Sequence, residues 1–223
     1  MLTAILVWLA LGLAAYGLGS IPTGYLAGRL RGIDIRTVGS GSTGATNVLR
    51  TLGRGPALVV FLVDLGKGAT AILLWRWVAH QWPGLLEVDT AWYEVWAAAA
   101  ALVGHSKPVW IGFQGGKSVA TGLGLLVVLS WPVALGALGV FGLTLLVSRI
   151  VSLGSILAAL AAVVLMGITH QPLPYLLFAI SGATYVIARH RSNLQRLAAG
   201  REPRLGEKLP GEPTESSLVQ PES

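Results

Sequence analysis

The stretch VGSGSTGATNVLR, from residue 38 to residue 50, combines residue types that are suited to binding a phosphate group. Its glycines let the backbone approach a ligand closely and adopt positive φ angles, so that successive N–H groups can face one anion. An arginine adds a planar guanidinium that matches phosphate oxygens. We therefore interpret the stretch as an anion-binding loop that leads into a helix, rather than as a flexible linker. The substrate-binding residues that we expect here are Ser40, Gly41, Thr46, Asn47 and Arg50.

A second candidate stretch is GHSKPVWIGFQGGKSVATGLG, residues 104–124. Lys117 stands just before an apolar run, so its ammonium group would lie near a helix N-terminus, where anions bind. The stretch is not a P-loop, because that pattern needs a glycine five residues before Gly116 and Ile111 stands there. His105 has two possible roles, which are contact with a ligand and a hydrogen bond that holds the loop.

Two further polar clusters follow, at 148–155 (SRIVSLGS) and 189–202 (RHRSNLQRLAAGRE). Ser152 stands at the beginning of an apolar run, where its hydroxyl can cap the helix, contact a ligand or do both. His190 and Asn193 are three residues apart and share one face of a helix. We expect them to act in catalysis by orientation or proton transfer, the alternative being an ordinary basic helix on anionic lipid.

The elements that carry these clusters must lie in a membrane. The chain of 223 residues is 53% hydrophobic and 12% charged, whereas soluble domains carry about 25% charge. Sustained apolar runs predict an all-α polytopic protein with about seven transmembrane helices, near 2–25, 56–79, 91–104, 118–131, 133–148, 152–169 and 173–188. The third and fourth runs are short, since 14 residues rise about 21 Å against a hydrocarbon core of roughly 30 Å. If this pair is re-entrant, five spans remain.

Lysine and arginine predict the orientation. The connections 26–55 and 105–117 and the segment after residue 188 are basic, whereas Arg76 is the one basic residue in the opposite connections, among Glu87, Asp89 and Glu94. The basic face is therefore cytoplasmic, with the N-terminus outside and the C-terminus inside. All four polar clusters fall on this face.

The chain divides into a membrane domain, residues 1–202, and a tail, residues 203–223, whose composition predicts a disordered cytoplasmic segment. Inside the second predicted span, Asp64 and Lys67 are three residues apart. We expect them to form an ion pair, because an unpaired charge in lipid is costly.

The chain contains no cysteine, so it has neither a thiol nucleophile nor a thiolate metal site. Histidine, aspartate and glutamate show no spacing typical of metal ligands. We therefore predict neither a metal ion nor another cofactor.

The motifs GSGSTGATNVLR, GHSKPVWIGFQGGKSVAT, SLGS and RHRSNLQRL, with GSIPTGYLAGRL at 19–30, resemble those of the acyl-phosphate-dependent glycerol-3-phosphate acyltransferases (PlsY) of bacterial membranes. The resemblance extends to about residue 202. It implies transfer of a fatty acyl group from acyl phosphate to the 1-hydroxyl of sn-glycerol 3-phosphate. The products are 1-acylglycerol 3-phosphate (lysophosphatidic acid) and phosphate, in the first step of phospholipid biosynthesis.

The resemblance also implies a seven-helix bundle in the bacterial cytoplasmic (inner) membrane, with a cytoplasmic active site. The expected partners are glycerol 3-phosphate, acyl phosphate, membrane lipids and an upstream enzyme that forms acyl phosphate, without nucleic acid. The residues 39–47 would cradle the acyl phosphate, and glycerol 3-phosphate would be held by Lys117, Arg50, Ser152, His190 and Asn193. Two positions depart from the family pattern, since Ser42 replaces a common Asn and Ser118 a common Gly.

Acyl phosphate is already activated, so positioning and electrostatics suffice and no strong protein base is expected. The H-x-x-x-x-D signature of acyl-CoA-dependent acyltransferases is absent, because the residues five after each histidine are Leu85, Trp110, Tyr175 and Gln195. The competing functions are a transporter, which the one-sided polarity disfavours, and a lipid-binding scaffold. A coenzyme A or acyl-carrier-protein thioester is the alternative acyl donor.

Overall fold

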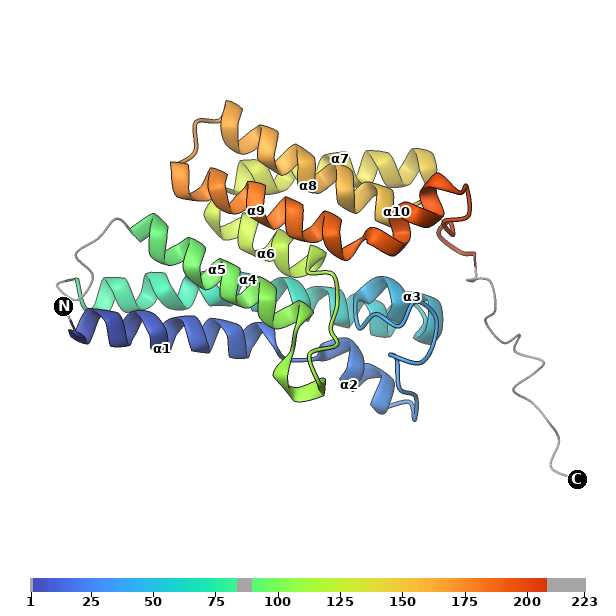
Figure 1. Ribbon diagram of the computed structural model, residues 1–223, viewed down its shortest axis with the longest axis horizontal. Coiled ribbons are helices and arrows are strands. Elements are labelled where there is room, and N and C mark those ends of the chain that lie inside the picture. Colours follow the sequence, from blue (N-terminus) through green and yellow to red (C-terminus); the bar gives the residue numbers. More distant parts are fainter. Residues whose placement is uncertain (1, 84–89, 208–223) are drawn as a thin grey trace, which may run out of the picture.

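The computed structural model describes residues 2–83 and 90–207, and within these ranges it is entirely helical. The chain folds into a bundle whose elements run nearly parallel to one long axis (Figure 1). The helices are α1 (Leu2–Gly19), α2 (Thr23–Arg29), α3 (Ala45–Leu52), α4 (Arg54–Gln81), α5 (Thr90–Ser106), α6 (Val119–Leu129), α7 (Trp131–Ser148), α8 (Val151–Ile168), α9 (Leu173–Arg189) and α10 (Arg191–Ala198), with a 3₁₀ turn at Val109–Ile111.

The predicted apolar runs all contain a helix. By length and composition, four segments can cross a membrane, namely Leu2–Arg29, Arg54–Gln81, Trp131–Ser148 and Val151–Ile168. The helices Val119–Leu129 and Leu173–Arg189 are apolar but shorter. The fourth predicted run, 118–131, extends too far, because Trp131 begins α7.

The first predicted helix, 2–25, is wrong at its C-terminal end. The helix α1 ends at Gly19, and α2 begins at Thr23 in a new segment. Pro22 separates the two, since proline has no N–H and disfavours helical geometry in the residue before it. The break lies against α5, where a Cβ on Gly19 would come within 2.2 Å of the carbonyl oxygen of Ala101.

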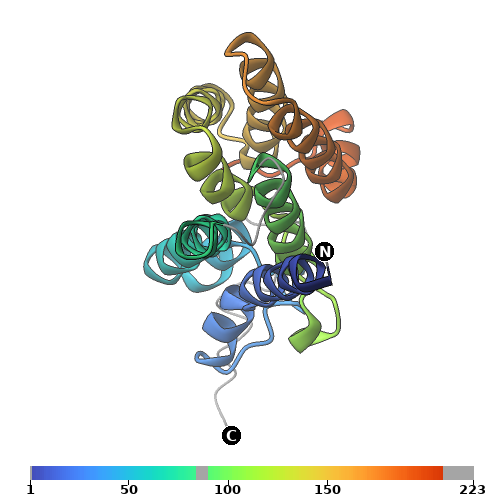
Figure 2. The same ribbon diagram turned by 90° about the vertical axis from the view of Figure 1, so that its left-hand side faces the viewer.

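The bundle has three layers when it is viewed end-on. The helices α5 and α6 lie between α1 and α4 on one side and α7, α8 and α9 on the other (Figure 2). The helices α2, α3 and α10 gather at one end of the bundle, and the N-terminus of α1 lies at the other end (Figure 1). The four polar clusters therefore meet at one end, as the sequence predicts.

Glycine allows α4 and α6 to touch through their backbones. A Cβ on Gly124 would stand 1.9 Å from the carbonyl oxygen of Leu65, and a Cβ on Gly68 would stand 2.2 Å from that of Thr121. Small residues at such crossings are the usual basis of helix association in membranes. This contact fixes the start of α6, which carries the Lys117 loop, relative to α4.

The first residues of the predicted tail contact the bundle. Pro203 is buried, and the N–H of Leu205 donates to the carbonyl oxygen of Arg149 at 2.6 Å. The Arg149 guanidinium donates in return to the Leu205 carbonyl oxygen at 2.8 Å. Residues 203–207 therefore lie against the α7–α8 turn, while the rest of the predicted tail, 208–223, lies outside the described residues.

We predict that Gly124→Ala destabilises the bundle, because the added methyl group overlaps the Leu65 carbonyl and overpacking of this kind costs about 1–3 kcal/mol. The thermal unfolding midpoint in detergent should fall. Gly66→Ala in α4 is the matched control, since its methyl group meets no atom within 4 Å. Equal midpoints for the two variants would contradict this account of the α4–α6 contact.

Candidate active site

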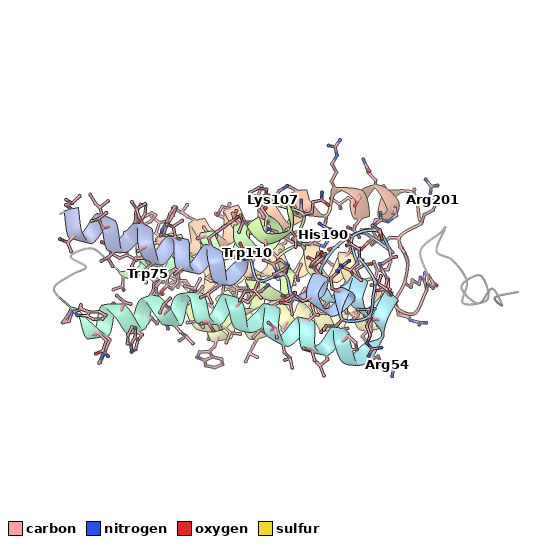
Figure 3. All side chains as sticks on the ribbon, turned by 90° about the horizontal axis from the view of Figure 1, so that it is seen from below. Arg54, Trp75, Lys107, Trp110, His190 and Arg201 are labelled. Atoms are coloured by element: carbon pink, nitrogen blue, oxygen red, sulfur yellow. The ribbon has the colours of Figure 1, made fainter. Side chains whose placement is uncertain are left out.

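A cavity of about 130 Å³ at the polar end of the bundle brings all four predicted clusters together. Figure 3 shows His190 toward the same end of the molecule as Arg54 and Arg201. Of the predicted site residues, Gly41 is not part of the cavity wall. The others line it, namely Ser40, Thr46, Asn47, Arg50, Lys117, Ser152, His190 and Asn193.

Asn47 shapes the first loop. Its side chain is almost fully buried, and its Nδ2 donates to the carbonyl oxygens of Ile35, Val38 and Ser42 at 2.9–3.1 Å. Its Oδ1 accepts from the N–H of Ser40 at 2.9 Å. Both the oxygen and the nitrogen of the amide thus bond to the loop backbone. Asn47 is therefore needed at this position to shape the loop, whether or not it also contacts a ligand.

The glycines of this loop are required by its backbone geometry. Gly39 and Gly41 have φ angles of 58° and 67°, in the region that favours glycine. The N–H of Gly41 donates to the Val38 carbonyl oxygen at 3.1 Å. Two other N–H groups, those of Ala45 and Thr46 in the first turn of α3, have no backbone or side-chain acceptor among the described residues and border the cavity. The α3 N-terminus is therefore the part of this loop best suited to an anion.

Glu202 is the residue that the sequence analysis missed. Its Oε1 accepts from Ser152 Oγ at 2.8 Å and from Asn193 Nδ2 at 2.6 Å. Its Oε2 accepts from Arg196 Nε at 2.7 Å. The Oδ1 of Asn193 in turn accepts from Lys117 Nζ. This carboxylate therefore connects three of the four clusters.

The charge of Glu202 is maintained by these contacts. Burial raises the pKa of its carboxyl group, but the hydrogen bonds from Asn193, Ser152 and Arg196 outweigh burial and hold the pKa below its usual value. A signal for this role exists in the sequence, since Glu202 is the one acid in the basic segment 189–204.

Lys117 is only partly secured in its charged form. Burial lowers the pKa of its ammonium group to about 8. The negative charge of Glu202 raises this pKa, whereas the positive charges of Arg196, Arg50 and Arg189 lower it further. The group is charged at neutral pH and loses its proton above pH 8. An incoming anion would relieve this repulsion between cations.

His190 is neutral at pH 7. Burial lowers the pKa of its imidazole to about 4, and Lys117 acts in the same direction. Its Nδ1 lies 2.8 Å from the carbonyl oxygen of Val186, which can only accept, so Nδ1 carries the proton. The Nε2 atom is left with a lone pair in a residue that lines the cavity.

The ion pair predicted within α4 is confirmed. Lys67 Nζ lies 2.7 Å from Asp64 Oδ1, and both side chains are buried. The same ammonium group donates to the Ile21 carbonyl oxygen at 2.9 Å and lies 3.2 Å from His105 Nδ1. Lys67 therefore joins α4, α5 and the break between α1 and α2 behind the cavity.

His105 holds the second loop, which was one of its two predicted roles. The N–H of Gly116 donates to the His105 carbonyl oxygen at 3.2 Å. A Cβ on Gly116 would stand 2.2 Å from His105 Nε2, so the loop packs directly on the imidazole ring. The ring also borders the cavity.

Ser118 has a left-handed backbone with a φ angle of 61°. This conformation favours glycine, in agreement with the glycine that is common at this position in the similar family. The serine hydroxyl donates to the Leu102 carbonyl oxygen at 2.8 Å and is fully buried. The departure from the family pattern therefore leaves the direction of the loop unchanged.

A second, apolar cavity continues from the polar one into the bundle. Both cavities share Phe61, Val119 and Phe141. Apolar side chains of α6, α7, α8 and α9 line the deeper part, among them Leu126, Ala137, Ala162 and Phe178. The cation-rich site thus opens into a space that suits a hydrocarbon chain.

The described residues contain no group of three histidine, cysteine, aspartate or glutamate side chains that could hold a metal ion.

A family model described as glycerol-3-phosphate acyltransferase matches residues 9–200. The chain belongs to the glycerol-3-phosphate acyltransferase family. It is 57% identical over 209 residues to the glycerol-3-phosphate acyltransferase of Synechococcus sp. strain JA-2-3B'a(2-13), covering 93% of this chain and 98% of the relative. The corresponding protein of Trichodesmium erythraeum is 52% identical over 217 residues, with 91% and 95% covered.

Two crystal structures of PlsY (YgiH), an integral membrane glycerol 3-phosphate acyltransferase, share this fold. The glycerol 3-phosphate form superposes with a TM-score of 0.81 at 39% identity, covering 90% of this chain and 96% of that chain. The lysophosphatidic acid form gives 0.78 at 38% identity, covering 89% and 95%. The resemblance seen in the sequence motifs is thus confirmed, and this chain is an integral membrane glycerol-3-phosphate acyltransferase of phospholipid biosynthesis.

We predict that Glu202→Gln lowers both stability and activity. The glutamine retains the shape of the side chain but removes the charge that faces Lys117 and Arg196, and one of its N–H groups would face the Arg196 donor. Loss of a charged hydrogen bond costs about 1–3 kcal/mol. The thermal midpoint and kcat/KM for glycerol 3-phosphate should both fall.

The control is Glu207→Gln, which changes an exposed carboxylate whose one acceptor contact within the described residues is with the backbone N–H of Arg204. Values for Glu202→Gln equal to those of this control would show that the carboxylate does not organise the site.

Proposed function

We propose that the enzyme transfers the acyl group of acyl phosphate to the 1-hydroxyl of sn-glycerol 3-phosphate, releasing 1-acylglycerol 3-phosphate and inorganic phosphate. The observation that carries the proposal is the junction of a cation-rich polar cavity with an apolar one at Phe61 and Phe141. The cations of the first cavity suit phosphate groups, and the apolar lining of the second suits an acyl chain. The PlsY crystal structures are described as forms with glycerol 3-phosphate and with lysophosphatidic acid.

The α3 N-terminus, with Ser40 and Thr46, is the group that we assign to the phosphate of acyl phosphate. Lys117 and Arg50 offset the repulsion between this phosphate and that of glycerol 3-phosphate. Ser152 and Asn193 hold the glycerol end, on the side of the cavity where Glu202 disfavours a second anion. The acyl chain lies in the apolar cavity, which orients its carbonyl carbon toward the glycerol hydroxyl.

The reaction requires little of the protein beyond position and charge. The 1-hydroxyl oxygen attacks the acyl carbonyl carbon, the carbon–oxygen bond to phosphate breaks, and the hydroxyl proton passes to the departing phosphate. His190 Nε2 accepts the hydrogen bond of the attacking hydroxyl and thereby orients it. With its low pKa, His190 is a weak base, which suits a reaction whose leaving group takes the proton.

We further propose seven membrane spans in the bacterial inner membrane, with the N-terminus outside and the polar end on the cytoplasmic side. The basic residues at that end and the positive-inside rule support this orientation. The 11 residues of α6 rise about 17 Å, so α6 begins part-way across the membrane and places Lys117 in a recess. An enzyme that forms acyl phosphate at the same face would supply the donor.

The donor is tested with protein purified in detergent, labelled glycerol 3-phosphate and either palmitoyl phosphate or palmitoyl coenzyme A. We expect labelled lysophosphatidic acid only from palmitoyl phosphate. A thioester has no phosphate on its acyl carbon, so the α3 N-terminus would have no group to bind. Product only from the thioester would overturn the proposed leaving group. Absence of product from both would remove the proposed reaction and favour transport of a solute, which proteoliposomes would detect.

We predict that kcat/KM for glycerol 3-phosphate falls as the pH rises above about 8. Lys117 is charged below its pKa of about 8 and neutral above it, so the attraction for the substrate phosphate is present at neutral pH and is lost in base. The substrate does not produce this change, since a phosphate monoester has its second pKa near about 6.

The measurement is the pH profile of kcat/KM from pH 6 to pH 10. In Lys117→Arg the charge persists in base, so the decline should move to higher pH or disappear. Lys107→Ala, at an exposed position, serves as the control and should retain the wild-type profile. A profile that is the same for wild type and Lys117→Arg would disprove the role of this ammonium group.

A further inference from the structure

A separate polar cavity lies at the end of the bundle opposite the active site. It has a volume of about 390 Å³ and is lined by Trp75, Arg76, Ala79, Thr90, Tyr93, Glu94 and Tyr175. Along α4, Trp75 is 11 residues from Asp64 in the active-site wall, a separation of about 17 Å at the helical rise. Figure 3 shows Trp75 and His190 toward opposite ends of the molecule. The reaction proposed above uses none of these residues.

A buried carboxylate, that of Glu94, binds two other residues of the cavity wall. Glu94 is 6% exposed, and its two oxygens accept from Arg76 Nε at 2.9 Å and from Arg76 Nη2 at 3.1 Å. The Tyr175 hydroxyl also donates to Glu94. The carboxylate therefore fixes the direction of the guanidinium, while the Arg76 side chain lines the cavity and stays 43% exposed.

Trp75 supplies a second donor with no acceptor. Its side chain is 2% exposed, and its indole Nε1 has no hydrogen-bond partner in the part of the chain described here. The Tyr93 ring stacks on the indole with centroids 5.1 Å apart, which fixes the direction of the N–H. A buried donor without a partner is uncommon in proteins and indicates a missing acceptor.

The surrounding aromatic residues place the cavity at the depth of lipid headgroups. Trp77 and Trp82 at the end of α4, and Trp92 and Trp96 in the first two turns of α5, are all exposed on the surface of the bundle. Tryptophan gathers at the membrane–water interface. A phospholipid headgroup at this depth offers phosphate oxygens that can accept from an arginine and from an indole N–H.

We propose that this cavity binds the phosphodiester headgroup of a membrane phospholipid, in the leaflet opposite the active site. Phosphate oxygens accept from Arg76 Nη1 and Trp75 Nε1, while the ion pair with Glu94 holds the arginine in place. The proposal does not depend on which acyl donor the enzyme uses.

Binding is tested by native mass spectrometry of the full chain in detergent, titrated with dioleoylphosphatidylglycerol or with dioleoylglycerol, which lacks the phosphate. Trp75→Phe removes the indole N–H, and we expect it to weaken phospholipid binding about tenfold, as loss of a hydrogen bond to a charged acceptor does. Trp77→Phe is the matched control, because it removes an indole two residues along the same helix, on the opposite side and outside the cavity. Wild type and this control should bind phospholipid equally.

Equal binding in Trp75→Phe and Trp77→Phe would overturn the assignment of this cavity. Equal binding of dioleoylglycerol and phospholipid by wild type would overturn the role of the phosphodiester, and this comparison holds even if Trp75→Phe does not fold. Inorganic phosphate at millimolar concentration distinguishes the source of the anion. If it displaces phospholipid from wild type but not the remaining phospholipid from Trp75→Phe, the cavity prefers free phosphate to a lipid headgroup, and the assignment to a lipid is overturned.

Discussion

The structure depends on keeping several positive charges close together beside a membrane. Isolated cations in such a place would repel one another and lose their hydration, both of which are costly. The Glu202 carboxylate resolves this conflict, because it binds Arg196 directly and reaches Lys117 through Asn193. The same carboxylate fixes Ser152 at the start of α8. Glu202 thus links α8 and α10 directly, and links the start of α6 to them through Asn193.

A second charged group supports the site from behind. Lys67 and Asp64 neutralise each other within α4, and Lys67 also engages His105 and the carbonyl oxygen of Ile21. The Gly116 backbone packs on the His105 ring, and this ring contacts Lys67 of the buried ion pair. The ion pair therefore positions the Lys117 loop indirectly, through His105. The first loop is fixed in a similar way by the buried amide of Asn47. Both loops of the site therefore obtain their shape from buried polar groups, Asn47 and His105, which also border the cavity.

The sequence predicts much of this arrangement because lipid imposes simple rules. The apolar runs identify helices, and the gathering of His190, Lys117 and Arg50 at one end follows from their places in the connections. Contacts that depend on tertiary structure are not predictable in this way. Glu202 was overlooked because its partners lie up to 50 residues away and its surroundings suggest a solvated basic segment. The break after Gly19 was missed because the apolar run continues through Pro22. The proline itself predicts a helix break, since it lacks the N–H that a helix interior requires.

The shared wall at Phe61 and Phe141 has a kinetic consequence. In the proposed reaction one substrate is a small solute that diffuses in three dimensions, whereas the product carries a hydrocarbon chain that would lie in the apolar cavity. The glycerol unit would therefore arrive from water as glycerol 3-phosphate. The acylated product would leave the site into the bilayer. The viscosity and chain order of the membrane would then govern how quickly the site empties, so that an enzyme which builds lipid would sense, through its own turnover, the fluidity of the lipid that it builds.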